Sequence, residues 1–236
     1  MSADSDAAGV ALFAKAPLAG RVKTRLSPTL SPEEAAEVAG ACLADTLERL
    51  TRRRDLTLTL FLDGEADEAL LGLATRLGVP IRPQAEGSLG ARLRVALGGL
   101  LEAGHVGVIA VGSDSPTLPP TRVAAAAAAL RAHDAVLGPT EDGGYYLIGV
   151  SRPAWALFEG IPWGTSGVAR ATRDRAAEAG ISLAELEPWY DVDDADTLRR
   201  AIADSDLQSA LGRWGSRRGS GMVRGRAADS ADSAGS

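Results

Sequence analysis

The stretch VALFAKAPLAGRVKTRL, residues 10–26, combines two features that decide the fold. Residues 10–14 form a short apolar run that stops at a Lys-Ala-Pro sequence, as a buried strand does where it enters a loop. Residues 15–25 then carry four cations within eleven residues of an acidic protein. We interpret the stretch as the first strand of an α/β sheet followed by an anion-binding loop.

The rest of the chain alternates apolar runs with helical patterns. Ser31-Pro32-Glu33-Glu34 supplies an N-cap, a proline at the first helical position and a capping-box glutamate, which predicts a helix to about Leu50. Pro119-Pro120 opens an alanine-rich helix. This alternation predicts an α/β sandwich of three layers, with a mostly parallel sheet between helices. We expect strands at 56–62, 79–82, 106–111, 135–137, 145–150 and 182–186, and further helices at 66–77, 89–103, 165–179 and 194–203.

Length and composition predict one ordered domain. A chain of 236 residues fits a single α/β core, which can grow to roughly 250 residues. From Gly212 onward the sequence is rich in Gly, Ser, Arg and Ala without periodicity. We therefore predict a domain over residues 1–212 and a disordered tail over 213–236.

Charge and hydropathy exclude several classes of protein. The net charge of −6 argues against a general nucleic-acid binder, which needs a basic face. No apolar run approaches the ~20 residues that span a bilayer, and residues 1–8 lack the features of a secretory signal. We expect a cytoplasmic protein without membrane contact. The single cysteine, Cys42, lies in a helical pattern, where burial is the usual outcome.

The cationic loop predicts a phosphate site. Gly20 lets the backbone approach a phosphate, while Lys15, Arg21, Lys23 and Arg25 supply charge and donors for a di- or triphosphate. The alternative is a solvated basic loop, but the position after the first strand of an α/β sheet favours phosphate. The loop matches neither a P-loop nor a Gly-x-Gly-x-x-Gly fingerprint.

Acidic residues at two other places predict a divalent-cation site. Asp114 directly follows the buried run 106–111, so its carboxylate should stand at the carboxyl edge of the sheet. Mg²⁺ typically takes one or two protein carboxylates and completes its shell with phosphate oxygens and water. Asp193 is our candidate for the second ligand, with Asp191 as the alternative, since both point to one side of an extended segment. Helix capping alone explains this acidic run equally well.

The stretch Glu141-Asp142-Gly143-Gly144-Tyr145 combines two acids, a flexible diglycine and an aromatic residue at a strand boundary. It predicts an acceptor pocket, although a hairpin turn explains the same pattern equally well. Trp163 is a candidate for stacking on a ligand ring, against the commoner role of packing.

These motifs resemble the bacterial glycosyltransferase-like proteins of the nucleotide-diphospho-sugar transferase superfamily, the group called DUF2064 or selenium-associated transferases. The resemblance spans residues 10–200. It rests on FAKAP with GRVKTRL at 13–26, Gln84 with LGARL at 89–93, GSDSP at 112–116, GP with EDGGYY at 138–146, Trp163 with Thr165, and DVD at 191–193.

The resemblance implies a GT-A (Rossmann-like) fold with Asp114 on Mg²⁺ or Mn²⁺. It also implies that Gln84, Gly90, Arg92 and Ser113 join the nucleotide site and that Thr165 joins the acceptor pocket. A more distant similarity links the chain to 2-phospho-lactate guanylyltransferases and to molybdenum-cofactor nucleotidyltransferases. Those proteins usually have a glycine-richer first loop, whereas this loop has only Gly20.

Three hypotheses follow. The first is metal-dependent glycosyl transfer from a nucleotide sugar to a small-molecule acceptor, with Glu141 or Asp142 taking the proton of an acceptor hydroxyl. The second is nucleotidyl transfer from a nucleoside triphosphate, such as guanylyl transfer to a phosphorylated small molecule, with release of pyrophosphate. The third is a catalytically silent nucleotide-binding protein. The residues do not indicate the base, the acceptor or the oligomeric state.

Overall fold

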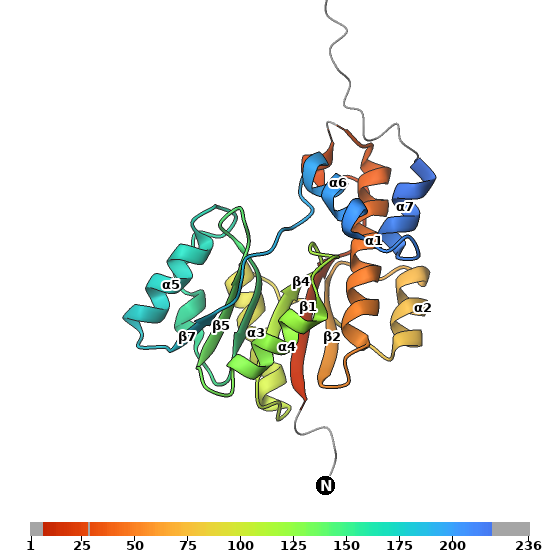
Figure 1. The fold of residues 1–236 in the computed structure, drawn as a ribbon. Helices are drawn as coiled ribbons and strands as arrows, with labels where there is room; N and C mark the ends of the chain where they lie inside the picture. Colours follow the sequence, from red (N-terminus) through yellow and green to blue (C-terminus); the bar gives the residue numbers. More distant parts are fainter. Residues whose placement is uncertain (1–6, 28, 219–236) are drawn as a thin grey trace, which may run out of the picture.

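A seven-stranded sheet organises the protein. The computed structural model describes residues 7–27 and 29–218, and its strands lie in the order β3-β2-β1-β4-β6-β5-β7 (Figure 1). The strands are β1 (Ala8–Lys15), β2 (Leu56–Asp63), β3 (Ile81–Pro83), β4 (Val108–Gly112), β5 (Ala135–Pro139), β6 (Tyr145–Val150) and β7 (Leu183–Glu185).

Most strand pairs are parallel, and β6 is the exception. β1 pairs in parallel with β2 and β4, and Leu12 stands in register with Leu60 on one side and Val111 on the other. β6 runs antiparallel to both β4 and β5. Only residues 140–144 join β5 to β6, which is too short for a parallel crossover and long enough for a hairpin. The predicted mostly parallel mixed sheet is confirmed.

Helices cover both faces of the sheet. Alternate side chains of β1 point to opposite faces, so Val10 and Leu12 join one buried cluster with α1, α2 and α4, while Ala11 joins another with α3 and α5. The helices are α1 (Pro32–Thr51), α2 (Glu68–Leu77), α3 (Leu89–Glu102), α4 (Pro120–Ala129), α5 (Val168–Glu178), α6 (Ala195–Asp204) and α7 (Ala210–Arg218), with short 3-10 turns η1 (Thr24–Leu26) and η2 (Trp155–Phe158).

Side-chain capping sets the start of several helices. Ser31 and Glu34 form the predicted capping box of α1, and Asp67 caps α2, which therefore begins two residues later than the predicted Ala66. Asp194 caps α6 in a second capping box. Most other observed bounds differ from the predicted ones by one to three residues, and β6 matches its prediction at both ends.

The predicted disordered tail begins too early. Residues 213–218 belong to α7, which packs with α1 and α6 around a third buried cluster and buries Trp214 to 1 % exposure. The buried carboxylate of Asp45 on α1 accepts hydrogen bonds from the backbone N–H groups of Ala210 (2.6 Å) and Leu211 (3.0 Å). This contact joins residues 165 positions apart, so local composition could not show it. Residues 219–236 of the predicted tail lie outside the described residues.

No helix within residues 7–27 and 29–218 has both the length and the apolar run needed to cross a bilayer.

Replacing Trp214 tests the docking of α7. Because the indole is buried, Trp214→Ala should lower the free energy of unfolding by about 3–5 kcal/mol in urea denaturation. The control is Leu207→Ala, which lies just before α7 and is 70 % exposed, and which should change stability by less than about 0.5 kcal/mol. Equal, small effects of both variants would mean that α7 does not pack against α1.

The reactivity of Cys42 tests the burial of α1. Burial raises the pKa of its thiol to about 12, so the native protein should hold it as an unreactive thiol at pH 8. Since the chain has one cysteine, a thiol reagent reports on this side chain alone. We expect rapid labelling only in denaturant; stoichiometric labelling of the native protein within seconds would contradict this packing.

Candidate functional site

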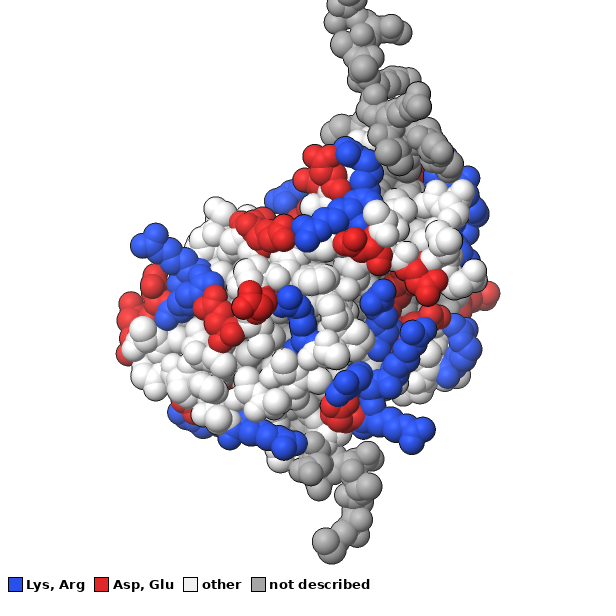
Figure 2. Space-filling view, in the orientation of Figure 1, with Lys and Arg blue, Asp and Glu red and all other residues white. Residues whose placement is uncertain are grey.

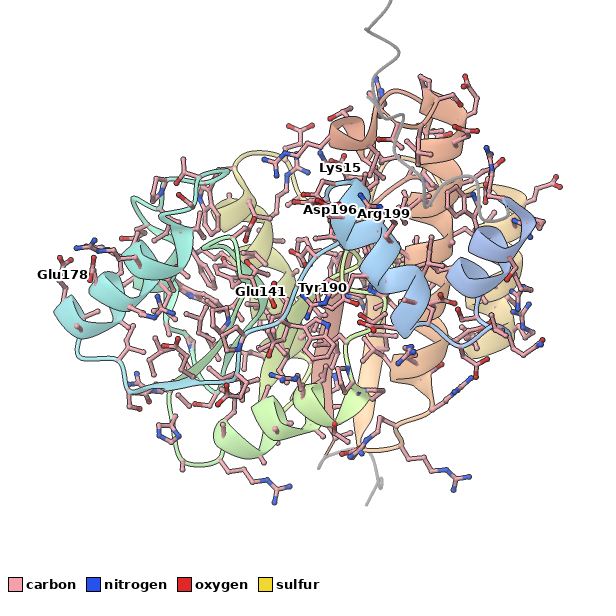
Figure 3. The ribbon with its side chains drawn as sticks, turned by 45° about the horizontal axis from the view of Figure 1, so that its top comes forward. Lys15, Glu141, Glu178, Tyr190, Asp196 and Arg199 are labelled. Carbon is pink, nitrogen blue, oxygen red and sulfur yellow. The ribbon has the colours of Figure 1, made fainter. Side chains whose placement is uncertain are left out.

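A cleft of about 720 Å³ opens at the carboxyl ends of the parallel strands. The end of the sheet that carries it faces the viewer in Figure 3, where Lys15 marks the end of β1. Ten predicted site residues line it: Lys15, Arg21, Lys23, Arg25, Gln84, Arg92, Ser113, Asp114, Trp163 and Asp193. The lining also includes residues that sequence analysis missed, among them Phe13, Asp63 and Leu89.

Lys23 is the buried centre of the cationic loop. Its side chain is only 5 % exposed, and its ammonium contacts the carboxylate of Asp114, the carbonyl oxygen of Val192 at 2.5 Å and Oδ1 of Asp193 at 4.0 Å. Lys23 adopts a left-handed backbone (φ 50°, ψ 36°), the only non-glycine residue with a positive φ within residues 7–27 and 29–218. This conformation costs about 1 kcal/mol or more, so the contacts of the ammonium must offset it.

Three segments meet at this ammonium. The loop after β1 brings Lys23, the loop after β4 brings Asp114, and the segment before α6 brings Asp193. The backbone N–H of Val192 also donates to the carbonyl oxygen of Asp114 (2.8 Å). Burial lowers the pKa of Lys23, but the carboxylates of Asp114 and Asp193 outweigh burial and hold the pKa above its ordinary value.

The two predicted second ligands lie in different surroundings. Asp193 is 40 % exposed and pairs with Arg25 (3.1 Å) in the cleft. Asp191 accepts a hydrogen bond from the Ser115 hydroxyl, and burial raises its pKa to about 6. Burial raises the pKa of Asp193 as well, so the pKa does not separate the two carboxyls. Their positions do, because Asp193 lines the cleft with Asp114 and Asp191 is not among the lining residues of the described chain.

The other cations of the loop reach into the cleft without burial. Lys15 and Arg21 are exposed, and the Arg25 side chain is 70 % exposed while touching Asp193. Gly20 has a φ of 73°, and a Cβ at this position would meet no atom within 4 Å. The turn therefore requires a left-handed backbone conformation at Gly20, which glycine adopts readily, and the space next to Gly20 is open.

A second basic region lies away from this cleft. Figure 2 shows Lys and Arg side chains gathered near the end of α1 and the start of β2. The turn between these elements contains Arg52, Arg53 and Arg54, which precede β2 and so lie at the amino end of the strands. This region therefore cannot share a ligand with the loop after β1.

Gln84, after β3, and Arg92, on α3, form the opposite wall of the cleft. The amide of Gln84 donates to the carbonyl oxygens of Ala14 (2.9 Å) and Phe61 (3.0 Å), which fixes its orientation. Arg92 pairs with Asp63 (2.9 Å) and Gln84 (3.2 Å). Ser113, which the family resemblance also placed in the nucleotide site, follows β4 beside Asp114 and lines the cleft.

Trp163 reaches the cleft because of its neighbours. Its ring packs edge-on against Tyr145 with centroids 6.2 Å apart. A side chain at Gly90 would come within 3.0 Å of the Trp163 ring and 2.7 Å of the Phe158 carbonyl oxygen. Gly90 therefore permits α3 to pack closely against Phe158 and Trp163. It is not among the lining residues of the cleft in the described chain.

The predicted acceptor residues around 141–144 have structural partners. Glu141 pairs with Arg200 (3.1 Å), and Asp142 accepts hydrogen bonds from the Thr140 hydroxyl (2.5 Å) and the Gly144 N–H (3.1 Å). A Cβ at Gly143 would meet the Ser166 carbonyl oxygen at 2.1 Å. None of these residues lines the cleft within the described part of the chain.

Thr165 also serves the backbone: its hydroxyl donates to the Pro162 carbonyl oxygen (2.8 Å) and accepts from the Gly167 N–H (3.2 Å). The catalytic roles of Glu141 and Asp142 and the acceptor role of Thr165 therefore stay predictions.

A four-layer stack leads into the acidic segment. Arg122 lies over Trp189 (4.8 Å to the centroid), Trp189 stacks on Tyr190 (5.6 Å), and Arg200 covers Tyr190 (3.8 Å). Glu141 and Tyr190 lie near each other in Figure 3, joined through Arg200. Cation–π contacts of this kind contribute about 0.5–2 kcal/mol each. The stack therefore fixes the chain immediately before Asp191, and the sequence carried no signal for it.

The donor set suits one cation. Within residues 7–27 and 29–218 there is no group of three or more His, Cys, Asp or Glu side chains that could hold a metal ion. Asp114 and Asp193 nevertheless face a common point, and that point already holds the positive charge of Lys23. Two carboxylates match the protein share of a Mg²⁺ shell that phosphate and water complete.

Comparison with solved structures shows the class of fold. A candidate nucleotide-diphospho-sugar transferase from Desulfovibrio desulfuricans G20 has a similar structure (TM-score 0.81, 28 % identity, 92 % of this chain and 96 % of that chain). A cytidylyltransferase from Leptospira borgpetersenii shares the fold at 12 % identity (TM-score 0.55, 94 % and 98 %). So does the protein Rv0371c of Mycobacterium tuberculosis H37Rv, solved with manganese, at 22 % identity (TM-score 0.52, 85 % and 100 %). The chain therefore has the fold of nucleotide-sugar and cytidylyl transferases.

The family follows from the sequence match. Residues 46–165, just over half of the chain, match the family described as uncharacterized proteins conserved in bacteria (DUF2064). The chain belongs to this family, as the motifs predicted. No curated protein matches the sequence.

Removing the Lys23 ammonium tests its role as counter-ion. Lys23→Met keeps most of the unbranched side chain but removes the ammonium and leaves Asp114 and Asp193 without their counter-ion, so stability should fall by about 1–3 kcal/mol. Added Mg²⁺ or Mn²⁺ should then raise the melting temperature of this variant more than that of the unchanged protein. The control is Arg21→Met, which removes a cation from the same loop outside this contact. If divalent cations shift all three proteins equally, Lys23 does not occupy a cation position.

Proposed function

We propose that this protein is a metal-dependent transferase that takes a nucleotide-diphospho sugar as donor and a small molecule as acceptor. One observation carries the proposal: the cationic loop after β1 and the carboxylates of Asp114 and Asp193 line a single cleft at the carboxyl ends of the strands. In open α/β sheets this edge is where ligands bind. The similarity to the D. desulfuricans protein supports the nucleotide-sugar class.

The loop cations would bind the diphosphate. Lys15, Arg21 and Arg25 line the cleft with exposed charged ends, and a guanidinium can hold two phosphate oxygens at once. Held in this way, the diphosphate is a better leaving group, because these cations stabilise the charge that develops on it.

Asp114 and Asp193 would hold Mg²⁺ or Mn²⁺ at the point where Lys23 now lies. Such a cation adds further positive charge beside the leaving diphosphate. The manganese bound by Rv0371c, a protein of the same fold, supports this assignment.

The acceptor would enter past Trp163. Trp163 and Gly164 line the same cleft, and the indole offers an apolar face to an acceptor. Glu141 and Asp142 remain candidates for taking the acceptor proton only if the loop 140–144 turns toward the cleft, since Arg200 and Thr140 now hold their carboxylates.

Nucleotidyl transfer from a nucleoside triphosphate is the second candidate. The observation in its favour is the number of exposed cations: Lys15, Arg21 and Arg25 line the cleft and, with a divalent cation at Asp114 and Asp193, would offset the charge of a triphosphate. The two reactions differ in product, because glycosyl transfer releases a nucleoside diphosphate and nucleotidyl transfer releases pyrophosphate.

Thermal shift with nucleotides tests the site. Nucleoside triphosphates and nucleotide sugars should raise the melting temperature, and Mg²⁺ or Mn²⁺ should increase the shift, because ligands that bind only the native state stabilise it. Asp114→Asn should abolish the metal-dependent part, and Arg25→Ala should weaken nucleotide binding even without metal. Asp174→Asn, a substitution on α5 away from the cleft, is the matched control and should change neither.

Product analysis then separates the candidates. A nucleoside diphosphate supports glycosyl transfer and pyrophosphate supports nucleotidyl transfer. Tight binding without either product would identify a nucleotide-binding protein without turnover. No metal-dependent shift with any nucleotide, or an unchanged metal effect in Asp114→Asn, would overturn the site.

A further inference from the structure

The cleft has a second polar end, away from the carboxylate pair. β1 separates β4, which leads to Asp114, from β2, which ends at Asp63. At a strand spacing of about 4.8 Å, these two sites are about 10 Å apart along the edge of the sheet. A nucleotide whose phosphates lie at the loop after β1 can therefore place its base near Asp63.

Asp63 and Arg92 present a free acceptor beside a free donor. Nη1 of Arg92 donates to Oδ2 of Asp63 (2.9 Å), and Nε donates to the Gly87 carbonyl oxygen (3.0 Å). Across residues 7–27 and 29–218, no protein atom hydrogen-bonds Oδ1 of Asp63 or Nη2 of Arg92. Both side chains line the cleft and are partly exposed, at 42 % and 27 %.

The neighbouring Gln84 cannot adapt to different bases. Both donor contacts of its amide go to backbone carbonyls of β1 and β2, and its oxygen faces Arg92 (3.2 Å). Asp63 and Arg92 therefore supply the free polar atoms at this end, while Phe13 and Leu89 supply apolar surface for the faces of a base.

Guanine is the base that matches this pair. Its Watson–Crick edge presents two adjacent donors, N1–H and N2–H₂, next to the O6 acceptor. A carboxylate accepts both donors, and a guanidinium donates to O6. Adenine and cytosine would turn a ring-nitrogen acceptor toward the carboxylate, and uracil would offer one donor flanked by two oxygens, so each leaves a repulsive or unpaired contact.

We propose that Asp63, oriented by Arg92, selects guanine nucleotides at this end of the cleft. This inference rests on the proposed function, because it assumes that the loop after β1 binds the phosphates. Asp63 was not among the residues that the sequence motifs placed in the site.

The test is direct titration with GDP, ADP, CDP, UDP and xanthosine diphosphate in the presence of Mg²⁺. The unchanged protein should bind GDP at least about tenfold more tightly than the other four, in line with about 1–3 kcal/mol for a bidentate contact. Asp63→Asn should lose this preference and gain affinity for xanthosine diphosphate, whose C2 oxygen can accept from the new amide. The control is Glu65→Gln, an exposed acid in the same loop, which should keep the preference for GDP.

Each outcome is decisive. A gain of xanthosine diphosphate binding cannot result from misfolding, so it supports the assignment even if Asp63→Asn is less stable. Equal affinities of the unchanged protein for all five nucleotides, or an unaltered preference in Asp63→Asn, would overturn guanine selection while leaving the phosphate site intact. Failure of every nucleotide to bind the unchanged protein would instead overturn the proposed function.

Discussion

The ammonium of Lys23 holds the two halves of the cleft together. It lies where the loop after β1, the loop after β4 and the segment before α6 meet, and it neutralises Asp114 and Asp193 at once. Without a positive charge at this point the two carboxylates would repel each other, and the backbone strain at Lys23 would have no compensation. This demand for positive charge is the reason for proposing a divalent cation at the same point.

The supports of this centre extend far from the cleft. The stack of Arg122, Trp189, Tyr190 and Arg200 fixes the chain before Asp191. Val192, between Asp191 and Asp193 in the sequence, is buried in the cluster formed with α1, α6 and α7. Val192 contributes both backbone groups, donating to Asp114 and accepting from Lys23. The C-terminal helices thus help to set the position of Asp193, although they lie behind the cleft.

Sequence patterns predicted the elements well and the distant contacts poorly. Val10 to Ala14, Ser31 with Glu34, and Pro119-Pro120 gave local signals, and the structure has the strand and helices they indicate. The cationic loop and Asp114 could be paired in advance because parallel strands end at one edge. α7 was missed because Asp45, 165 residues away, supplies its cap. Asp63 was missed because its partner in the cleft is Arg92, 29 residues away. Gly90 and Gly143 were assigned to ligand sites, although close backbone packing accounts for them.

The most direct measurement is the anomalous diffraction of manganese in crystals grown with Mn²⁺ and a nucleotide. We expect one strong peak between the carboxylates of Asp114 and Asp193, with the Lys23 ammonium displaced from that point and the phosphates against the loop after β1. A peak elsewhere, or an undisturbed contact of Lys23 with Asp114 beside a bound nucleotide and metal, would contradict a cation site at this pair of carboxylates.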